Sequence, residues 1–211
     1  EFLERLGFRW RPSLGYPDYY PEKPGGSIFG RSIEGALFDG RQLGVWLARL
    51  HRYPNLPSVP LHTNEASQFA LVLRTPNGAL TAARVVWRLL SYRLRGRVPL
   101  TLGASLIGQL LSLCLQRSIP IWLESPLVEL LTEDGAVVGA VVQHQGRPVR
   151  IRARGGVLLA AGGFAHNREM RERYHPHPIT TEWTSAAPSD TGDAIRAAHA
   201  IGAALALMDD A

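Results

Sequence analysis

The residues best suited to chemistry surround a pair of glycines, Gly162 and Gly163, that follows an apolar run. The run, residues 157–161, has the uninterrupted apolar character of a buried strand in a parallel sheet, and such strands end at the sheet edge where ligands bind. Because Ala160, Ala161 and the two glycines have small side chains or none, a planar cofactor or its pyrophosphate could approach the backbone closely. A tight strand-to-helix turn without a ligand explains the residue types equally well.

A second candidate is the segment from Ser189 to Ile195, Ser-Asp-Thr-Gly-Asp-Ala-Ile. Either of its first two residues could cap a helix that runs to Ile201. Asp193 would then lie at the start of the helix, where free backbone N–H groups bind anions and polar ligand groups. A routine capped helix is the simpler alternative.

Metal and thiol chemistry have little support. The pair His175 and His177 lies in a Pro-containing loop without further ligands, so we assign no metal site. The single cysteine, Cys114, excludes a disulfide within the chain and fits a reducing compartment, so we expect a cytoplasmic protein. Its apolar neighbours indicate a buried helix thiol. No apolar run reaches the roughly 18 residues that a membrane-spanning helix needs.

The elements that must position these residues follow from hydrophobic periodicity. Helical spacing predicts helices over 1–9, 41–50, 79–95 and 104–117, and more weakly over 65–74. Short apolar runs predict strands at 119–124, 127–132, 137–143 and 149–154. Asp134-Gly135 between two of these runs indicates a hairpin, so an antiparallel meander should precede the strand 157–161. The Pro-rich segment 53–60 indicates a surface connection.

The chain has 211 residues, 45% of them hydrophobic, which is ordinary for a protein that buries a core. Its formal charge is +5, almost all of it from arginine, which suits anionic cofactors or nucleic acid but also fits codon bias. Arg84, Arg88 and Arg95 lie near helical spacing and indicate a solvated helix face, with phosphate or partner contact as the alternative.

From Leu100 to Ala211 the order of motifs resembles the flavoprotein superfamily of fumarate reductases, succinate dehydrogenases and 3-ketosteroid dehydrogenases. The matching residues are Asp134-Gly135, Val138-Gly139, Gly156 to Phe164, Asn167, Asp190 to Ile195, Gly202-Ala203 and Met208-Asp209. The N-terminal part, with Pro17 to Gly26, Gly30 to Glu34 and Phe38 to Arg41, is similar to the 3-ketosteroid Δ1-dehydrogenase branch. The resemblance covers almost the whole chain and is weakest from Leu50 to Arg95.

The resemblance implies an α/β fold: a partial Rossmann-like FAD-binding domain over 1–168 with an inserted antiparallel β-meander, and the start of a substrate (cap) domain over 169–211. It implies FAD as the cofactor. The residues implied to bind it are Val128, Ala160, Ala161, Gly162, Gly163, Asn167 and Asp193. In the family a tyrosine of the first loop assists proton abstraction. Tyr19 is the best match because an aromatic residue, Tyr16, lies three positions earlier, and Tyr20 is the competitor.

The implied reaction is 1,2-desaturation of a 3-keto steroid, in which a tyrosine takes a proton next to the carbonyl and hydride passes to flavin N5. The implied partner is therefore a hydrophobic, steroid-like small molecule, and we expect no nucleic-acid partner. A tyrosine ordinarily has a pKa of about 10, so a base role requires stabilisation of the phenolate. The residues leave the oligomeric state and the electron acceptor open.

One departure from the family is plain: the sequence contains no G-x-G-x-x-G turn for the FAD pyrophosphate. We therefore expect a partial chain that binds FAD weakly by itself. Three alternatives remain: a fumarate-reductase-like flavoenzyme, an inactive remnant, and a basic non-catalytic binding module that uses the face from Arg84 to Arg97 and binds nucleic acid in a salt-sensitive way.

Overall fold

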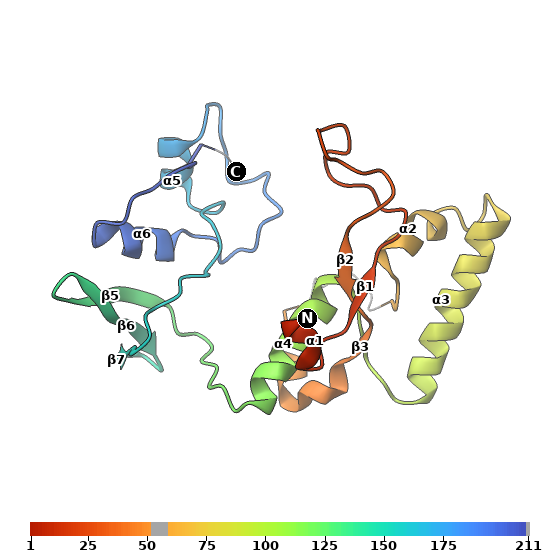
Figure 1. Ribbon diagram of the computed structural model, residues 1–211, viewed down its shortest axis with the longest axis horizontal. Coiled ribbons are helices and arrows are strands. Elements are labelled where there is room, and N and C mark those ends of the chain that lie inside the picture. The colour runs from red at the N-terminus through yellow and green to blue at the C-terminus, as the bar shows by residue number, and fades with distance from the viewer. Residues whose placement is uncertain (52–58, 210–211) are drawn as a thin grey trace. The chain divides into compact units, whose positions relative to one another are not determined.

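The computed structural model describes residues 1–51 and 59–209, which form parts of two compact units, Glu1–Pro120 and Ile121–Ala211 (Figure 1). Most of the Pro-rich segment 53–60 lies outside the described residues, as do residues 210 and 211. The domain boundary expected after residue 168 stays a prediction.

The first unit combines helices with two short antiparallel ribbons. Its elements are α1 (Phe2–Arg5), β1 (Trp10–Pro12), β2 (Ile33–Gly35), β3 (Phe38–Asp39), the 3₁₀ segment η1 (Gly40–Arg49), α2 (Thr63–Phe69), α3 (Pro76–Leu94), β4 (Pro99–Leu100) and α4 (Leu102–Gln116). The ribbons pair β1 with β2 and β3 with β4. All five predicted helical regions are confirmed with shifted ends, although η1 is two pieces joined at a kink, where Gly44 has φ 55°. Neither ribbon was predicted, because strands of two or three residues show no alternation.

Helix α4 forms the centre of this unit and packs against β2, β3, β4 and η1. Buried apolar side chains contributed by different elements include Leu43, Leu100 and Leu113. The helix also fastens the base of the β1–β2 ribbon: Gln109 Oε1 accepts from the Arg9 N–H at 2.8 Å, and the hydroxyl of the fully buried Ser105 donates to the Ala36 carbonyl.

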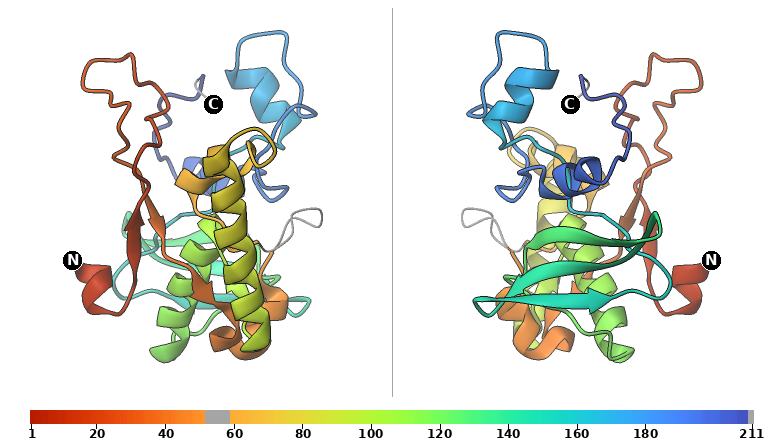
Figure 2. Two further views of the ribbon diagram at one scale, coloured as in Figure 1. Left: turned by 90° about the vertical axis from the view of Figure 1, so that its right-hand side faces the viewer. Right: turned by 90° about the vertical axis from the view of Figure 1, so that its left-hand side faces the viewer.

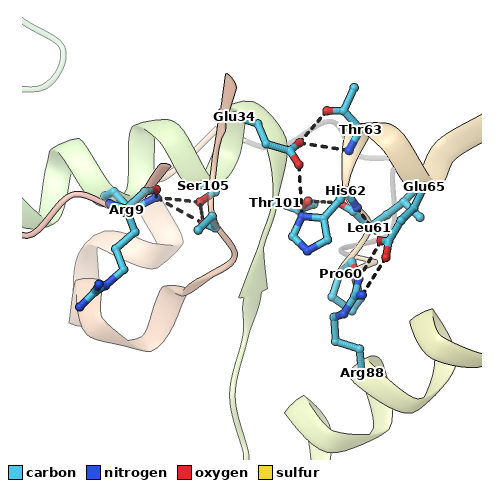
Figure 3. Close-up of polar contacts among 12 residues, drawn as sticks. Arg9, Glu34, Pro60, Leu61, His62, Thr63, Glu65, Arg88, Thr101 and Ser105 are labelled. Carbon is cyan, nitrogen blue, oxygen red and sulfur yellow. Dashed lines mark hydrogen bonds and ion pairs between the residues drawn. The ribbon is translucent and has the colours of Figure 1, made fainter. Parts of the chain in front are cut away.

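A polar network joins β2 to α2 (Figure 3). The buried Glu34 accepts from the Thr63 N–H at 3.1 Å and from the Thr63 hydroxyl at 2.6 Å. His62 Nδ1 lies 3.2 Å from the other Glu34 oxygen but outside hydrogen-bonding geometry. Burial lowers the pKa of His62, and the positive charge of Arg11 adds to this, so the imidazole favours its neutral form.

A second part of the network joins α2 to α3 through Glu65 and Arg88 (Figure 3). Arg88 Nη1 and Nη2 each donate to the Glu65 carboxylate at 2.8 Å, and Nη1 also donates to the Pro60 carbonyl at 2.6 Å. The bidentate bond to Arg88 is the main cause that lowers the pKa of Glu65 from 4.5 to about 2. Arg88 is therefore not part of a solvated arginine face, which corrects the expectation from spacing; it points inward, whereas Arg84 is exposed.

The second unit contains a three-stranded antiparallel sheet, β5 (Leu127–Glu133), β6 (Ala136–His144) and β7 (Arg147–Arg152), followed by α5 (Arg168–Tyr174) and α6 (Asp193–Ala200) (Figure 2). The predicted meander is confirmed. Asp134 and Gly135 have φ of 49° and 78°, the two positive values that a type I′ hairpin turn requires. Of the two helices, α5 was not predicted.

Two predicted strands are absent. Residues 119–124 and 157–161 carry no strand assignment, and within the described residues no backbone hydrogen bond holds 157–162. A buried parallel strand needs neighbours on both sides, and every strand pair among the described residues is antiparallel. The segment is consequently exposed, with Leu158 at 90%. The mixture of helix and sheet is as expected, whereas the Rossmann-like arrangement stays a prediction.

Among the described residues, no helix is long and apolar enough to cross a bilayer.

Candidate functional site

In the second unit, the turn that contains Gly162 and Gly163 is hydrogen-bonded to the loop that precedes α6. Both segments are irregular, so hydrogen bonds rather than a sheet hold them together. Three of these bonds run from the Gly192 N–H to the Gly163 carbonyl (3.0 Å), from Asn167 Nδ2 to the Thr191 carbonyl (2.8 Å) and from the His166 N–H to the Asp190 carbonyl (2.9 Å). A fourth joins His166 Nε2 to the Ala186 carbonyl at 3.1 Å. Residues 162–167 and 186–192, joined in this way, are called the clasp. Two of the regions singled out in the sequence are therefore adjacent.

The glycines of the clasp are explained by different constraints. Gly162 and Gly192 have φ of 77° and 76°, and a Cβ would lie 2.3 Å from Asp190 Oδ1 at Gly162 and 2.5 Å from Met170 Sδ at Gly192. The packing of the chain therefore explains both glycines. At Gly163 a Cβ would meet nothing within 4 Å. Gly163 is the glycine that internal packing does not require, and its open side leaves room for a bound group.

A cavity of about 260 Å³ lies between the extended segment 159–162 and α6. Most of its lining side chains are small and apolar. They come from Leu159, Ala160, Ala161 and Gly162 on the extended segment, from Ala194, Ile195 and Ala198 on α6, and from Ala203, Ala204 and Leu205 after it. The structure therefore brings three of the predicted cofactor-binding residues to one cavity wall. The alanines of the α6 wall were missed, although their spacing of four residues was a usable signal for a common helix face.

Asp193 lies in the first turn of α6, as expected, but the residue that caps the helix is Gly192, not Ser189 or Asp190. Asp193 Oδ1 accepts from Arg196 Nη2 at 2.6 Å and Oδ2 from the Thr191 hydroxyl at 2.9 Å. These bonds, that to Arg196 first, lower the pKa of Asp193, so the carboxylate stays charged at the positive end of the helix dipole.

Asn167 uses both ends of its amide within the chain. Its Oδ1 accepts from the Met170 N–H at 3.0 Å and so caps α5, while Nδ2 donates to the Thr191 carbonyl. The helix that it caps presents Met170, which packs below Gly192, and the buried ring of Phe164 lies beside them. Asn167 therefore positions the clasp.

Replacing Asn167 by alanine removes the α5 cap and the bond to Thr191 together. We expect a loss of about 2 kcal/mol in the local stability of the clasp. Amide hydrogen exchange of α5 and of residues 163–167 measures it. Asn167→Asp is the matched control: it keeps an acceptor for the Met170 N–H but loses the donor to Thr191, so it should recover part of the protection. Unchanged exchange in Asn167→Ala would contradict the positioning role.

Five predicted site residues do not line the cavity: Gly163, Asn167 and Asp193, described above, and also Val128 and Tyr19. Val128 is on β5, the strand against which α6 packs, and is 55% exposed. Tyr19 belongs to the first unit and lies in the long loop between β1 and β2, a loop that Figure 1 shows. Its side chain is 90% exposed within the described residues.

The loop that carries Tyr19 is ordered as an extension of the ribbon. Backbone hydrogen bonds continue the pairing of β1 and β2 into the loop. They join the Ser13 N–H to the Ser32 carbonyl (2.9 Å), the Gly15 N–H to the Phe29 carbonyl (3.1 Å) and the Asp18 N–H to the Ser27 carbonyl (2.9 Å). Asp18, next to Tyr19, also accepts from Arg31 Nε at 3.1 Å, and this pairing lowers the pKa of Asp18. A fixed backbone thus presents an outward-pointing phenol.

Among the described residues, no group of three or more His, Cys, Asp or Glu side chains could hold a metal ion.

Comparison with known proteins identifies relatives of the whole chain. A family model described as FAD binding domain matches residues 1–211. The chain is 43% identical to a 3-oxosteroid 1-dehydrogenase of Mycobacterium tuberculosis over 96% of its length, and 32% identical to a 4-oxocyclohex-2-ene-1-carboxylate 5-dehydrogenase of Sinomonas cyclohexanicum over 76%.

Among solved structures, the chain resembles 3-ketosteroid delta1-dehydrogenase from Sterolibacterium denitrificans in complex with 1,4-androstadiene-3,17-dione. The two share 34% identity with a TM-score of 0.85, and the match covers 98% of this chain and 40% of that one. The chain spans 37% of the Mycobacterium tuberculosis relative and 28% of the Sinomonas cyclohexanicum relative.

Proposed function

This chain belongs to the FAD binding domain family, and from that premise we propose that it forms part of an FAD-dependent dehydrogenase that desaturates a 3-keto steroid or a similar cyclic ketone. The observation that carries the proposal is the cavity of about 260 Å³ between the segment 159–162 and α6. Its alanine and glycine wall allows a planar group to approach the backbone, and the family's cofactor supplies such a group.

The residues fit FAD. Ala160, Ala161 and Gly162 would form the wall against the cofactor, since they line the cavity and have small side chains or none. Gly163 continues this wall, and no described atom would lie within 4 Å of a Cβ placed there. Asn167 would hold that wall in place, and Asp193 would keep the start of α6 anchored. When bound, FAD supplies a hydride acceptor, and the part left to the protein is to orient the substrate and to move a proton.

Tyr19 is our choice for the residue that moves the proton. Its hydroxyl is carried on an ordered, outward-pointing loop and makes no hydrogen bond to any other described residue, so it is free to meet a substrate. The carbonyl acidifies the proton on the neighbouring carbon, so the reaction needs a base at that carbon, and Tyr19 would fill this role as its phenolate. Tyr20, 66% exposed, is the alternative in the same loop.

The choice of a cyclic ketone rests on what the relatives have in common. The names of the two curated relatives and of the solved structure each contain an oxo-substituted ring or a ketosteroid. The steroid is favoured within this class, because the 3-oxosteroid 1-dehydrogenase match has the higher identity and covers more of the chain. A fumarate-reductase-like activity has less support: an acrylate reductase flavoprotein subunit of Shewanella woodyi matches only 35% of the chain.

FAD binding by the cavity wall tests the cofactor part of the proposal. We expect the purified 211-residue chain to retain less than one FAD per molecule, because its sequence has no G-x-G-x-x-G turn. In equilibrium dialysis against FAD, Ala160→Leu and Ala161→Leu should each weaken the remaining affinity by about tenfold, since both residues line the cavity and a leucine fills the space proposed for the cofactor.

Leu158→Gln is the matched control, because Leu158 lies in the same segment but does not line the cavity. It should leave FAD affinity unchanged. A stoichiometric flavin absorbance in the purified chain would show that the expected weakness is wrong. Equal FAD affinities in the leucine variants and the control would show that the cavity wall is not part of the FAD site.

A further inference from the structure

Helix α3 carries an apolar stripe on the side that faces away from its own unit. Thr81 and Val85 are buried on its inner side. With 100° per residue, five positions of α3 after its first residue, Pro76, lie within about 40° of the direction opposite Val85. They are Leu80, Ala83, Trp87, Leu90 and Leu94, here called the α3 stripe. Trp87 is 71% exposed and Leu94 85%. In the left view of Figure 2, α3 faces the viewer and no other described element of its unit covers it.

Positive charge surrounds the α3 stripe. The exposed Arg84 and Arg93 flank it on opposite sides of the helix. Between Glu65 and Glu124 the sequence contains no acidic residue and seven arginines, Arg74, Arg84, Arg88, Arg93, Arg95, Arg97 and Arg117. Arg88 pairs with Glu65, and Arg97 Nε lies 3.7 Å from Asp39 Oδ2. The other five form no ion pair among the described residues. The stripe is thus an apolar surface within a field of one sign.

We propose that the α3 stripe docks on an anionic lipid bilayer, lying in the plane of its surface. A helix with Trp and Leu on one side and arginines at its flanks is the arrangement that inserts its apolar side at the headgroup boundary while cations meet the lipid phosphates. Tryptophan favours this boundary because its ring is apolar and its N–H is polar. Since no described helix can cross a bilayer, the contact is peripheral.

The charge pattern argues against the other occupants of such a face. A second copy of the chain would bring two arginine-rich, acid-free surfaces together, and like charges repel. Nucleic acid would satisfy the arginines but would leave the exposed leucines and Trp87 against phosphates. An anionic bilayer alone matches both the apolar stripe and its charged borders. The inference does not depend on the enzymatic activity proposed above.

Co-sedimentation with lipid vesicles tests the proposal on the 211-residue chain. We expect binding to vesicles that contain phosphatidylglycerol and phosphatidylcholine, at least about tenfold weaker binding to phosphatidylcholine alone, and a decline as salt concentration rises. The double variant Trp87→Glu/Leu94→Glu should lose binding to the anionic vesicles by at least about tenfold, because it places two acids in the stripe.

Val45→Glu is the matched control, since Val45 is 84% exposed in η1 of the same unit and lies outside the stripe. It adds a negative charge with the same exposure and should bind nearly as the unchanged chain does. Circular dichroism checks that all variants remain folded. Equal losses in the control and the double variant would overturn the proposal, as would failure of the unchanged chain to bind anionic vesicles. Concentration-dependent self-association that Trp87→Glu/Leu94→Glu abolishes would replace the bilayer by a second copy.

The remaining outcome concerns longer proteins, because the curated relatives exceed this chain in length. If a longer protein that contains these residues does not bind the anionic vesicles, other segments cover the stripe and the proposal fails. Retained binding with the same sensitivity to Trp87→Glu/Leu94→Glu supports it.

Discussion

Arg88→Ala is expected to lower the free energy of unfolding of the first unit by about 3 kcal/mol. The guanidinium makes both bonds to the Glu65 carboxylate and one to the Pro60 carbonyl. Alanine would leave a largely buried carboxylate with little more than the His62 N–H as its donor, and a carbonyl without one. The loss should be large because removing one member of a buried pair leaves the other charge uncompensated.

Urea unfolding followed by circular dichroism measures this loss, with Arg84→Ala as the control because Arg84 is an exposed arginine of the same helix. The control should change stability by less than about 0.5 kcal/mol. A loss in Arg84→Ala as large as in Arg88→Ala would mean that helix propensity or net charge, not the pair, is responsible.

Acid titration identifies the pair as the cause. The pKa of Glu65 is lowered to about 2 from 4.5, so its contribution is fully present above pH 4.5 and is lost as pH falls through the folded-state value. Arg88→Ala should remove this part of the acid dependence. The same slope in the unchanged chain and in Arg88→Ala would contradict the assignment.

Tyr19→Phe is expected to reduce steady-state dehydrogenation by at least about a hundredfold in an FAD-loaded protein that contains these residues. Only the hydroxyl is removed, and that side chain is 90% exposed, so the fold of the unit should not change. The reduction should lie in kcat more than in KM, because the proton is transferred in the chemical step. Reduction of the bound flavin by a 3-keto steroid in single turnover follows the step directly.

Tyr20→Phe and Tyr16→Phe are the matched controls, since they remove the same atom from neighbouring positions of the loop. Each should retain most of the rate. If Tyr20→Phe shows the loss instead, the role moves one residue along the chain. If all three variants remain active, the proton passes to another group and the loop serves only to bind substrate.

The elements that could be predicted from the sequence are those held by local interactions. The meander was found because Asp134-Gly135 and the alternation beside it specify a hairpin within a few residues. The helices were found because their periodicity is local as well. The strand expected at 157–161 depends on neighbours that its own residues do not encode, and the described residues contain none. An uninterrupted apolar run indicates that a strand would have to lie between neighbouring strands, but it does not identify those neighbours.

In the candidate site as well, the features that depend on local sequence could be predicted, whereas those that depend on contacts between distant residues could not. Ala160, Ala161 and Gly162 were identified because small residues after an apolar run are visible in the sequence, and they do line the cavity. The Glu34–Thr63 and Arg88–Glu65 contacts join residues 29 and 23 positions apart, and no spacing rule connects them. Asn167 was chosen by resemblance as a cofactor contact, and only its hydrogen bonds reveal that it serves the clasp.

The exposed segment 157–161 has a consequence for the behaviour of the chain in concentrated solution. Its residues, Val-Leu-Leu-Ala-Ala, are apolar, uncharged and free of proline, and their N–H and C=O groups have no ladder among the described residues. Such an edge is a template on which a strand from another molecule can add, and repeated addition leads to aggregation. The apolar character that predicted a buried strand here therefore makes this segment a point at which the chain, by itself, is expected to aggregate.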